Sequence, residues 1–325
     1  MRKVVFKSER KVALEQYDPG KLAPGFIRVR HLYSQLSAGT EMNMLTGKQG
    51  PVKDIVPGYS GVGEVIEGFE GTSFKKGDIV MTGEKHKDII DIPHDWAAQT
   101  FCPVSRKFAK ESTFLQLGKV ALHGIHRVNF KLGDWIAVFG LGIVGQLSAQ
   151  LASLSSGGRV IGIDISAARR KTAEKTGIRT VDPSSPSYIE AVNKITGGGA
   201  DIILETSGNG KALADAFKVA GYGGQVALVG GQTEPRELDM MHEVQFKELA
   251  IVGARRCDMA VPTPYDKWTV MRYMQEFQNF IEAGKLQIDP LISHLAKPEQ
   301  APEIYEKLLK RDESVVGVVF DWTAS

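Results

Sequence analysis

The feature that most constrains this chain is a glycine-rich turn, GLGIVG at positions 140–145, set between two hydrophobic patterns. The apolar run 135–139 before it predicts a buried strand, and the apolar positions of 146–154 recur at helical spacing. A second strand, 159–163, ends in Asp164, which is 19 residues beyond Gly145. In this strand–turn–helix–strand context the turn is typical of a dinucleotide-binding site.

Each part of the turn has a separate expected role. Gly140 permits the tight turn, Gly142 lets the backbone approach a pyrophosphate, and Gly145 allows close packing of the helix. Ile143 and Val144 open that helix, whose N-terminus attracts phosphate. A glycine turn that binds nothing is the alternative.

The end of the second strand predicts which dinucleotide binds. Asp164 is expected to hydrogen-bond the adenosine ribose, with Ile165 beside it, and its charge would repel a 2′-phosphate. The sequence therefore favours NAD over NADP. Arg169 and Arg170 follow closely enough to leave NADP possible.

Further cofactor contacts are expected where other strands of the sheet end, because parallel sheets bind ligands at these carboxyl edges. The residues after strands 201–205 and 225–228 are Thr206, Ser207, Gly208, Val229, Gly230 and Gly231. Arg255 lies near the end of this region, where it could hold a cofactor phosphate or form a solvated salt bridge.

Composition narrows the class of protein. The 325 residues suffice for two domains, and 40 Lys and Arg nearly balance 38 Asp and Glu. This balance favours a small-molecule substrate over nucleic acid or a membrane surface. No apolar run approaches the ~20 residues that span a bilayer, so we expect a cytoplasmic protein. Cys102 and Cys257 cannot build a disulfide framework and are expected to be ordinary thiols.

The hydrophobic pattern divides the chain into three parts. Residues 1–118 contain short alternating runs between glycines, which predicts a β-rich barrel. Residues 119–256 alternate strands with helices, which predicts a parallel sheet built from βαβ units. After 257, helices are expected over 268–283 and 298–310, and a strand over 315–320.

Several motifs resemble the medium-chain dehydrogenase/reductase superfamily over essentially the whole chain. They are SAGTE at 37–41, VPGYSGVGEV at 56–65, FKKGDIV at 74–80, the glycine turn, and DPLISH at 289–294. The resemblance implies an α/β protein in which a GroES-like catalytic domain (1–118 and 257–325) encloses a Rossmann domain (119–256). It also implies an active site in the interdomain cleft. We expect a homodimer or homotetramer.

The metal ligands of zinc-dependent relatives are replaced here. At the positions that the resemblance assigns to catalytic zinc, the chain has Ala38, Tyr59 with Ser60, and approximately Leu115, and 83–101 lacks the cysteines of a structural zinc. Methyl and isobutyl groups cannot bind zinc, so neither metal is expected. A nonstandard site of His86, Asp91 and His94 is the alternative, although these residues are expected to decorate a surface loop.

Without a metal, side chains must move the proton and stabilise the substrate oxygen. The resemblance assigns the proton-passing hydroxyl to Thr40, and the Tyr59 phenol could serve as a general acid or base. Glu41 could orient either of them. The alternatives are that Tyr59 only fills the vacant metal pocket and that Glu41 pairs with an arginine.

His123, and less directly His126, is a further catalytic candidate, on the helix that enters the cofactor domain. Histidines in that helix could equally be satisfied core or surface residues. The sequence as a whole predicts a zinc-independent, NAD-preferring oxidoreductase that interconverts a secondary alcohol and a ketone on a sugar, aminocyclitol or polyol. A quinone or enoyl reductase using NADPH is one alternative, and a non-enzymatic NAD-binding sensor is another.

Overall fold

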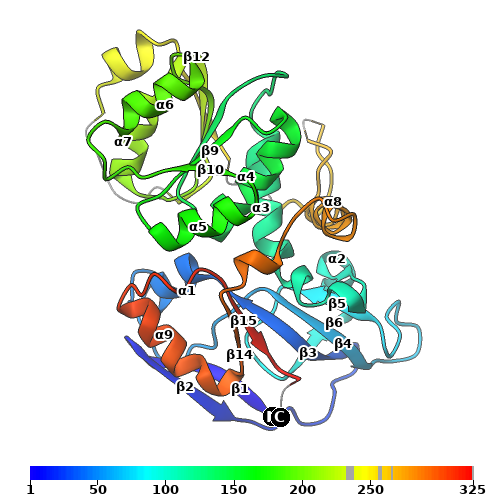
Figure 1. Cartoon of the computed structure of the whole chain (residues 1–325). Coiled ribbons are helices and arrows are strands. Elements are labelled where there is room, and N and C mark those ends of the chain that lie inside the picture. The colour runs from blue at the N-terminus through cyan, green and yellow to red at the C-terminus, as the bar shows by residue number, and fades with distance from the viewer. Residues whose placement is uncertain (232–237, 255–257, 265, 324–325) are drawn as a thin grey trace. The chain divides into compact units, whose positions relative to one another are not determined.

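The computed structural model describes residues 1–231, 238–254, 258–264 and 266–323 (Figure 1). The chain divides into two compact units. Unit 1 comprises 1–116, 260–283 and 292–325, and unit 2 comprises 117–259 and 284–291.

Unit 2 is built on a six-stranded parallel sheet with the order β10-β9-β8-β11-β12-β13. Its strands are β8 (Ile136–Phe139), β9 (Val160–Ile163), β10 (Arg179–Val181), β11 (Ala200–Glu205), β12 (Ala220–Leu228) and β13 (Ala250–Gly253). Its helices are α4 (Ile143–Ser156), α5 (Ala167–Lys175), α6 (Tyr188–Thr196), α7 (Gly210–Val219), η3 (Met240–Gln245) and η4 (Asp289–Leu291), preceded by α3 (Leu115–His126). The strand order reverses between β8 and β11, and ligands bind at such a switch point in open α/β sheets.

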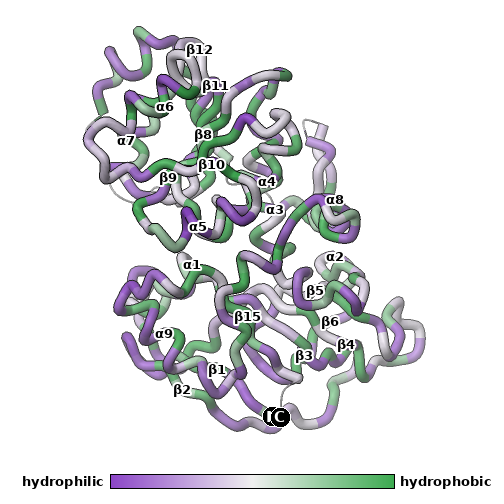
Figure 2. Tube along the Cα trace, viewed as in Figure 1, coloured by the Kyte–Doolittle hydropathy of each residue, from purple (hydrophilic) through white to green (hydrophobic). Residues whose placement is uncertain are grey.

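Burial explains why the central strands read as continuous apolar runs. Every residue of β8 and β9 is buried, as expected for parallel strands covered by helices on both faces. Figure 2 shows the hydrophobic colour along these strands. Phe139, Ile161 and Val226 join Phe217 of α7 in one core. The α/β class and the parallel sheet predicted from the sequence are confirmed.

Unit 1 contains a seven-stranded sheet with the order β14-β15-β3-β4-β5-β7, in which β6 pairs with β3, and a separate β1-β2 pair. Its strands are β1 (Arg2–Ser8), β2 (Lys11–Gln16), β3 (Phe26–Leu36), β4 (Gly61–Glu67), β5 (Ile79–Thr82), β6 (Ile89–Pro93), β7 (Cys102–Pro103), β14 (His294–Ala296) and β15 (Val318–Asp321). Its helices are α1 (Ala38–Leu45), α2 (His94–Thr100), η1 (Arg106–Phe108), η2 (Glu111–Phe114), α8 (Val270–Glu282), η5 (Pro298–Gln300) and α9 (Ala301–Leu309). The chain thus combines a β-rich unit with an open parallel α/β unit, the two kinds of unit that the sequence predicts.

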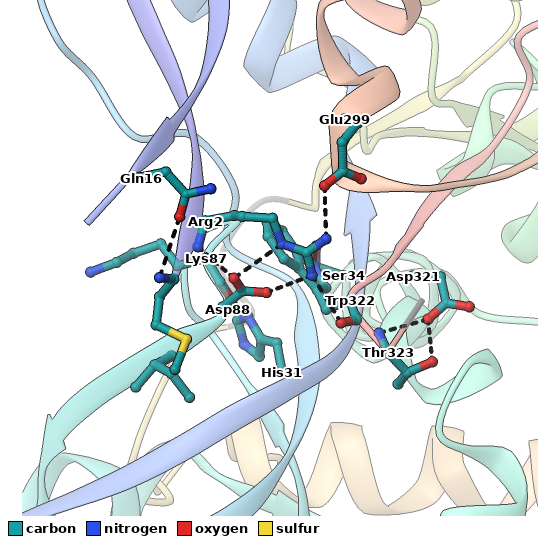
Figure 3. Close-up of polar contacts among 12 residues, drawn as sticks. Arg2, Gln16, His31, Ser34, Lys87, Asp88, Glu299, Asp321, Trp322 and Thr323 are labelled. Carbon is teal, nitrogen blue, oxygen red and sulfur yellow. Dashed lines mark hydrogen bonds and ion pairs between the residues drawn. The ribbon is translucent and has the colours of Figure 1, made fainter. Parts of the chain in front are cut away.

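The first and last strands of unit 1 are joined by the guanidinium of Arg2 (Figure 3). Arg2 lies 3.0 Å from a carboxylate oxygen of Asp88 and 2.8 Å from one of Glu299, and it donates to the carbonyl of Trp322 at 3.2 Å. Residues far apart in the chain are thereby held at one place in the sheet.

The imidazole of His31, in β3, is fully buried with a hydrogen bond at each nitrogen. Nδ1 lies 2.8 Å from the Lys87 carbonyl oxygen, and Nε2 lies 3.0 Å from Thr82 Oγ1. Burial disfavours the charged ring and lowers the pKa of His31 to about 4. The folded protein therefore holds this histidine neutral over a pH range in which the unfolded chain protonates it.

We predict that His31 makes the protein sensitive to acid. Its contribution is complete above the unfolded pKa near 6.5 and is lost as the pH falls to about 4, because the unfolded chain binds the extra proton. The loss amounts to about 3 kcal/mol of unfolding free energy. Urea unfolding at pH 7.5 and 4.5 should show a smaller pH effect in His31→Gln than in wild type. An equal pH effect in both proteins would contradict the prediction.

Candidate functional site

Three hydroxyl groups meet at the start of α1 in unit 1. Ser37 and Thr40 lie at the first turn of this helix, and Tyr59 precedes β4. The Tyr59 hydroxyl donates to Ser37 Oγ at 2.5 Å and lies 3.3 Å from Thr40 Oγ1. The two hydroxyls that the sequence singled out are thus brought together, and Ser37 joins them.

Glu41 lies directly behind this group and is completely buried. Its carboxylate accepts the backbone N–H of Ser37 at 2.7 Å and the hydroxyl of Tyr305, and it lies 3.2 Å from His86 Nε2. The alternative that Glu41 pairs with an arginine is therefore wrong, since its partners are Ser37 at the start of α1, His86 between β5 and β6, and Tyr305 in α9. The buried carboxylate is compensated by several donors, as its burial requires.

The side chains at the expected metal positions do not fit a zinc site. Ala38 offers a methyl group, Ser60 Oγ donates to the Thr113 carbonyl at 2.5 Å, and Leu115 is fully buried as an apolar residue. Tetrahedral zinc needs three side-chain nitrogen, sulfur or oxygen donors and one open position. Within the described part of the chain, no three His, Cys, Asp or Glu residues are arranged to hold a metal ion.

The nonstandard set of His86, Asp91 and His94 does not converge. Asp91 pairs with Arg28 at 2.6 Å, and His94 lies 3.2 Å from Asp95. The expectation that all three decorate a surface loop is wrong: Asp91 lies in β6, His94 begins α2, and the ring of His86 is completely buried. It is buried because it bridges two other parts of unit 1, α1 and the segment 57–59.

Two remaining candidates are buried. His123 lies in α3, where it is 4% exposed, and its catalytic role stays a prediction. Burial raises the pKa of the Cys102 thiol to about 12, which makes it a poor nucleophile at neutral pH. Cys257 lies outside the described residues.

The glycine turn of unit 2 has the geometry that the sequence predicted. Gly140 has φ +85°, and a Cβ there would lie 2.7 Å from Ser207 Cβ. A Cβ at Gly145 would overlap the Gly140 carbonyl oxygen, whereas one at Gly142 would meet nothing within 4 Å. Ile143 and Val144 form the first turn of α4. The free approach to Gly142 at a helix N-terminus fits a pyrophosphate.

Asp164 is nearly buried at the end of β9. It accepts the backbone N–H of Leu141 at 2.6 Å and that of Ser166 at 2.8 Å. These bonds tie the carboxylate to the glycine turn and leave further lone pairs for ribose hydroxyls. Ile165 beside it is 73% exposed.

The two arginines after β9 differ in their interactions with the protein. Arg170 pairs with Asp182 at 2.8 Å and donates to the Asp164 carbonyl at 2.7 Å. Arg169 is more exposed and lies 3.6 Å from an Asp164 carboxylate oxygen. Only Arg169 therefore has a guanidinium that could turn toward a 2′-phosphate.

The other predicted cofactor residues form the ends of β11 and β12. The Thr206 hydroxyl donates to the Gly140 carbonyl at 2.8 Å, and the Ser207 hydroxyl donates to Glu205, so both brace the protein itself. A Cβ on Gly230 would lie 2.6 Å from the Gly208 nitrogen. Of the remaining predicted cofactor residues, Val229 is buried and Gly231 is exposed. Arg255 lies outside the described residues.

Comparison with known proteins finds similarity to dehydrogenases. A family model described as "Zinc-binding dehydrogenase" matches residues 144–274, which include none of the expected metal positions. D-guloside 3-dehydrogenase of Escherichia coli (strain K12) is 25% identical over 98% of this chain and 100% of its own. The 2-desacetyl-2-hydroxyethyl bacteriochlorophyllide A dehydrogenase of Cereibacter sphaeroides is 27% identical over 99% of this chain and 98% of its own.

A solved structure extends the match to the fold. Galactitol-1-phosphate dehydrogenase from Escherichia coli superimposes with a TM-score of 0.83 at 19% identity, over 99% of this chain and 100% of that one. The chain belongs to the medium-chain dehydrogenase/reductase superfamily. It is an oxidoreductase of the alcohol dehydrogenase type. Other solved structures of this fold hold NADP or NADH.

Among the described helices, none is both long and apolar enough to cross a membrane.

The sequence did not identify three residues of the hydroxyl site: Ser37, His86 and Tyr305. Ser37 stands in the SAGTE motif, so its place at the helix start was a usable signal. Tyr305 is 264 residues from Glu41, and no local pattern indicates that they meet. The sequence predicts a surface loop for His86, and the neighbouring Lys85 and Lys87 give no sign that its ring is buried.

Proposed function

We propose that this dehydrogenase interconverts a secondary alcohol and a ketone on a polar substrate, with NAD and without catalytic zinc. The observation that carries the proposal is the Tyr59 hydroxyl, which is bonded to Ser37 and faces Thr40. It occupies a position where the resemblance expects a metal ligand. A hydroxyl network at that position can bind the substrate oxygen directly.

The proton route follows from these contacts. A phenol can donate its proton to a carbonyl oxygen or accept one from an alcohol, and the Ser37 and Thr40 hydroxyls can replenish or remove it. Glu41 holds the Ser37 end of this route through the backbone N–H. NAD, when bound, supplies the hydride acceptor. The glycine turn at 140–145 and Asp164 would hold it.

The proposed substrate class is a sugar, aminocyclitol or polyol. A site of three hydroxyl groups offers both donors and acceptors, which suits a substrate carrying several hydroxyls. The relative named D-guloside 3-dehydrogenase supports this class, since a guloside is such a substrate.

We predict that purified protein carries no stoichiometric zinc and that chelators leave its activity unchanged. The reason is that Ala38 and Leu115 have no donor atoms and that the Ser60 hydroxyl is bonded to Thr113. Elemental analysis, followed by NADH production from a panel of sugars and polyols with and without EDTA, tests this. About one zinc per chain, with activity lost on its removal, would contradict the proposal.

The same panel separates other functions. Oxidation of NADPH with a conjugated enone, and none with ketoses, would indicate a quinone or enoyl reductase. NAD binding without turnover on any alcohol would indicate a sensor.

We predict tighter binding of NAD than of NADP. The buried Asp164 carboxylate would face the 2′-phosphate, and two like charges in a poorly hydrated place repel strongly. Asp164→Ser should narrow or reverse the preference by about 1 to 3 kcal/mol. Calorimetric titration with both cofactors measures this, and Asp182→Asn, which removes a nearby charge bonded to Arg170, is the control. A wild-type preference for NADP would contradict the assignment and direct attention to Arg169.

A further inference from the structure

The imidazole of His86 lies at the junction of the two segments that carry the proposed catalytic hydroxyls. His86 follows β5 and is completely buried. Its two ring nitrogens have different partners: Nδ1 lies 2.7 Å from Ser34 Oγ, and Nε2 lies 3.2 Å from a Glu41 carboxylate oxygen. A histidine held at both nitrogens has a fixed ring orientation.

The donors and acceptors along this chain of contacts fix where the protons lie. Trp322 Nε1 donates to Ser34 Oγ at 2.8 Å, and Figure 3 shows these two residues beside each other. A carboxylate can only accept, so the His86 nitrogen that faces Glu41, Nε2, carries a proton, and the Ser34 hydroxyl can donate to Nδ1. Donation runs in one direction, from Trp322 to the carboxylate.

The first arm of His86 reaches the helix that carries Thr40. Its acceptor, Glu41, is the next residue along α1 and also accepts the backbone N–H of Ser37. Ser37 in turn accepts the hydroxyl proton of Tyr59. Loss of the His86 donor would leave the buried Glu41 carboxylate with one hydrogen bond fewer. The carboxylate could then shift, and with it the Ser37 N–H that it accepts at the start of α1.

The second arm reaches the segment that carries Tyr59. The backbone N–H of His86 donates to the Pro57 carbonyl at 2.8 Å. Gly58 has φ +100°, and a Cβ there would lie 2.8 Å from His86 Cγ. The ring therefore packs against the backbone immediately before Tyr59, which is possible only because residue 58 has no side chain.

We propose that His86 is a positioning residue, which holds the Tyr59 phenol against Ser37 and Thr40 by clamping residues 57–59 to α1. This inference rests on the proposed function for its effect on rate, but not for the position of the phenol. The hydrogen bonds of Tyr59 to Ser37 and Thr40 do not by themselves explain what holds residues 57–59 in place beside α1.

Two substitutions of His86 separate its arms. In His86→Gln the amide nitrogen can reach the place of Nε2 and donate to Glu41, whereas in His86→Asn the shorter amide stays near Ser34. His31→Asn is the matched control, because it removes a second fully buried imidazole, whose ring nitrogens contact the Lys87 carbonyl and Thr82 instead of Glu41. The ring of His31 lies against Gly61, two residues from Tyr59. His31→Asn therefore tests whether any loss of a buried ring near Tyr59 shifts the signal.

The main readout is the ¹⁹F NMR signal of 3-fluorotyrosine placed at position 59 of the full chain, with kcat, KM and thermal unfolding measured on the same proteins. In His86→Asn we expect the signal to shift and kcat to fall by about 10-fold to 100-fold, with NAD affinity unchanged, because a small misplacement of a reacting group has this cost. In His86→Gln both should return toward wild type. His31→Asn should lower the unfolding temperature and leave the signal in place.

An unshifted signal in folded His86→Asn, or an equal shift in His86→Gln, would overturn the proposal. If His86→Asn does not fold, Ser34→Ala decides, because it frees the ring without removing it: a shifted signal supports the clamp, and an unshifted one overturns it. A shifted signal in His86→Asn together with full turnover in Tyr59→Phe would support the clamp while refuting the catalytic role of Tyr59. The two failures are therefore distinguishable.

Discussion

Tyr59→Phe and Thr40→Val are each expected to lower the rate of hydride transfer by about 10²-fold to 10⁴-fold, the usual scale for a positioned general acid or base. The phenyl ring and the isopropyl group keep the volumes of the originals, so loss of packing should not imitate the effect. Single-turnover measurement of NADH absorbance isolates this step from product release. NAD affinity should change little, since the hydroxyls lie in unit 1 and the glycine turn in unit 2.

A matched control removes another phenol hydroxyl from the same unit. Tyr33→Phe removes a phenol hydroxyl from β3, whereas the hydrogen bonds of the candidate site join Tyr59 to Ser37 and Thr40. It should retain the wild-type rate. Unimpaired single-turnover transfer in Tyr59→Phe would assign Tyr59 to filling the old metal position and leave Glu41, His123 or an ordered water to be tested.

Gly145→Ala is expected to weaken NAD binding by moving the glycine turn, whereas Gly142→Ala is expected to weaken it without disturbing the fold. A methyl group on Gly145 would overlap the Gly140 carbonyl oxygen and lie 2.7 Å from Thr206 Oγ1, so the glycine turn must move. Overpacking of this kind costs about 1 to 3 kcal/mol or more. If this cost falls on the cofactor-bound turn, at 1.4 kcal/mol per tenfold, the affinity should fall by roughly 5-fold to 100-fold.

The Gly142 variant provides the internal control. Its Cβ would meet no atom of the protein, and φ −65° suits alanine, so thermal unfolding should change little. NAD affinity should nevertheless fall, because the methyl group would stand where the pyrophosphate approaches the backbone. Calorimetric titration and thermal unfolding of both variants test this. Wild-type affinity in Gly142→Ala would place the phosphates elsewhere.

The parts of this structure that could be predicted from the sequence are those governed by local rules. The glycine turn lies between a buried strand and a helix, and the parallel sheet of unit 2 follows from repeated βαβ units. Thr40 and Tyr59, which the sequence names as separate catalytic candidates, lie 3.3 Å apart, and their catalytic role stays a prediction.

The unpredicted parts depend on long-range contacts. His86 is buried because Glu41, Ser34 and Gly58 surround it, and none of these is a sequence neighbour. Residues 84–87 include Glu84, Lys85 and Lys87, which locally suggests an exposed loop. Thr206 and Ser207 were assigned to the cofactor from their place at a strand end, but their hydroxyl protons are used within the protein. Their position at the end of a strand predicts where these side chains lie, but not which group each of them hydrogen-bonds.

The pairing of β3 with β15 also determines how this chain must fold during synthesis. Leu36 pairs with Val318, so the sheet of unit 1 cannot be completed until residue 318 has left the ribosome. Most of unit 2, in contrast, is continuous from 117 to 259 and can assemble while translation proceeds. The N-terminal strands therefore wait, with an open edge, through most of translation. During that interval nascent chains are most exposed to pairing with one another, and holdase chaperones are most useful.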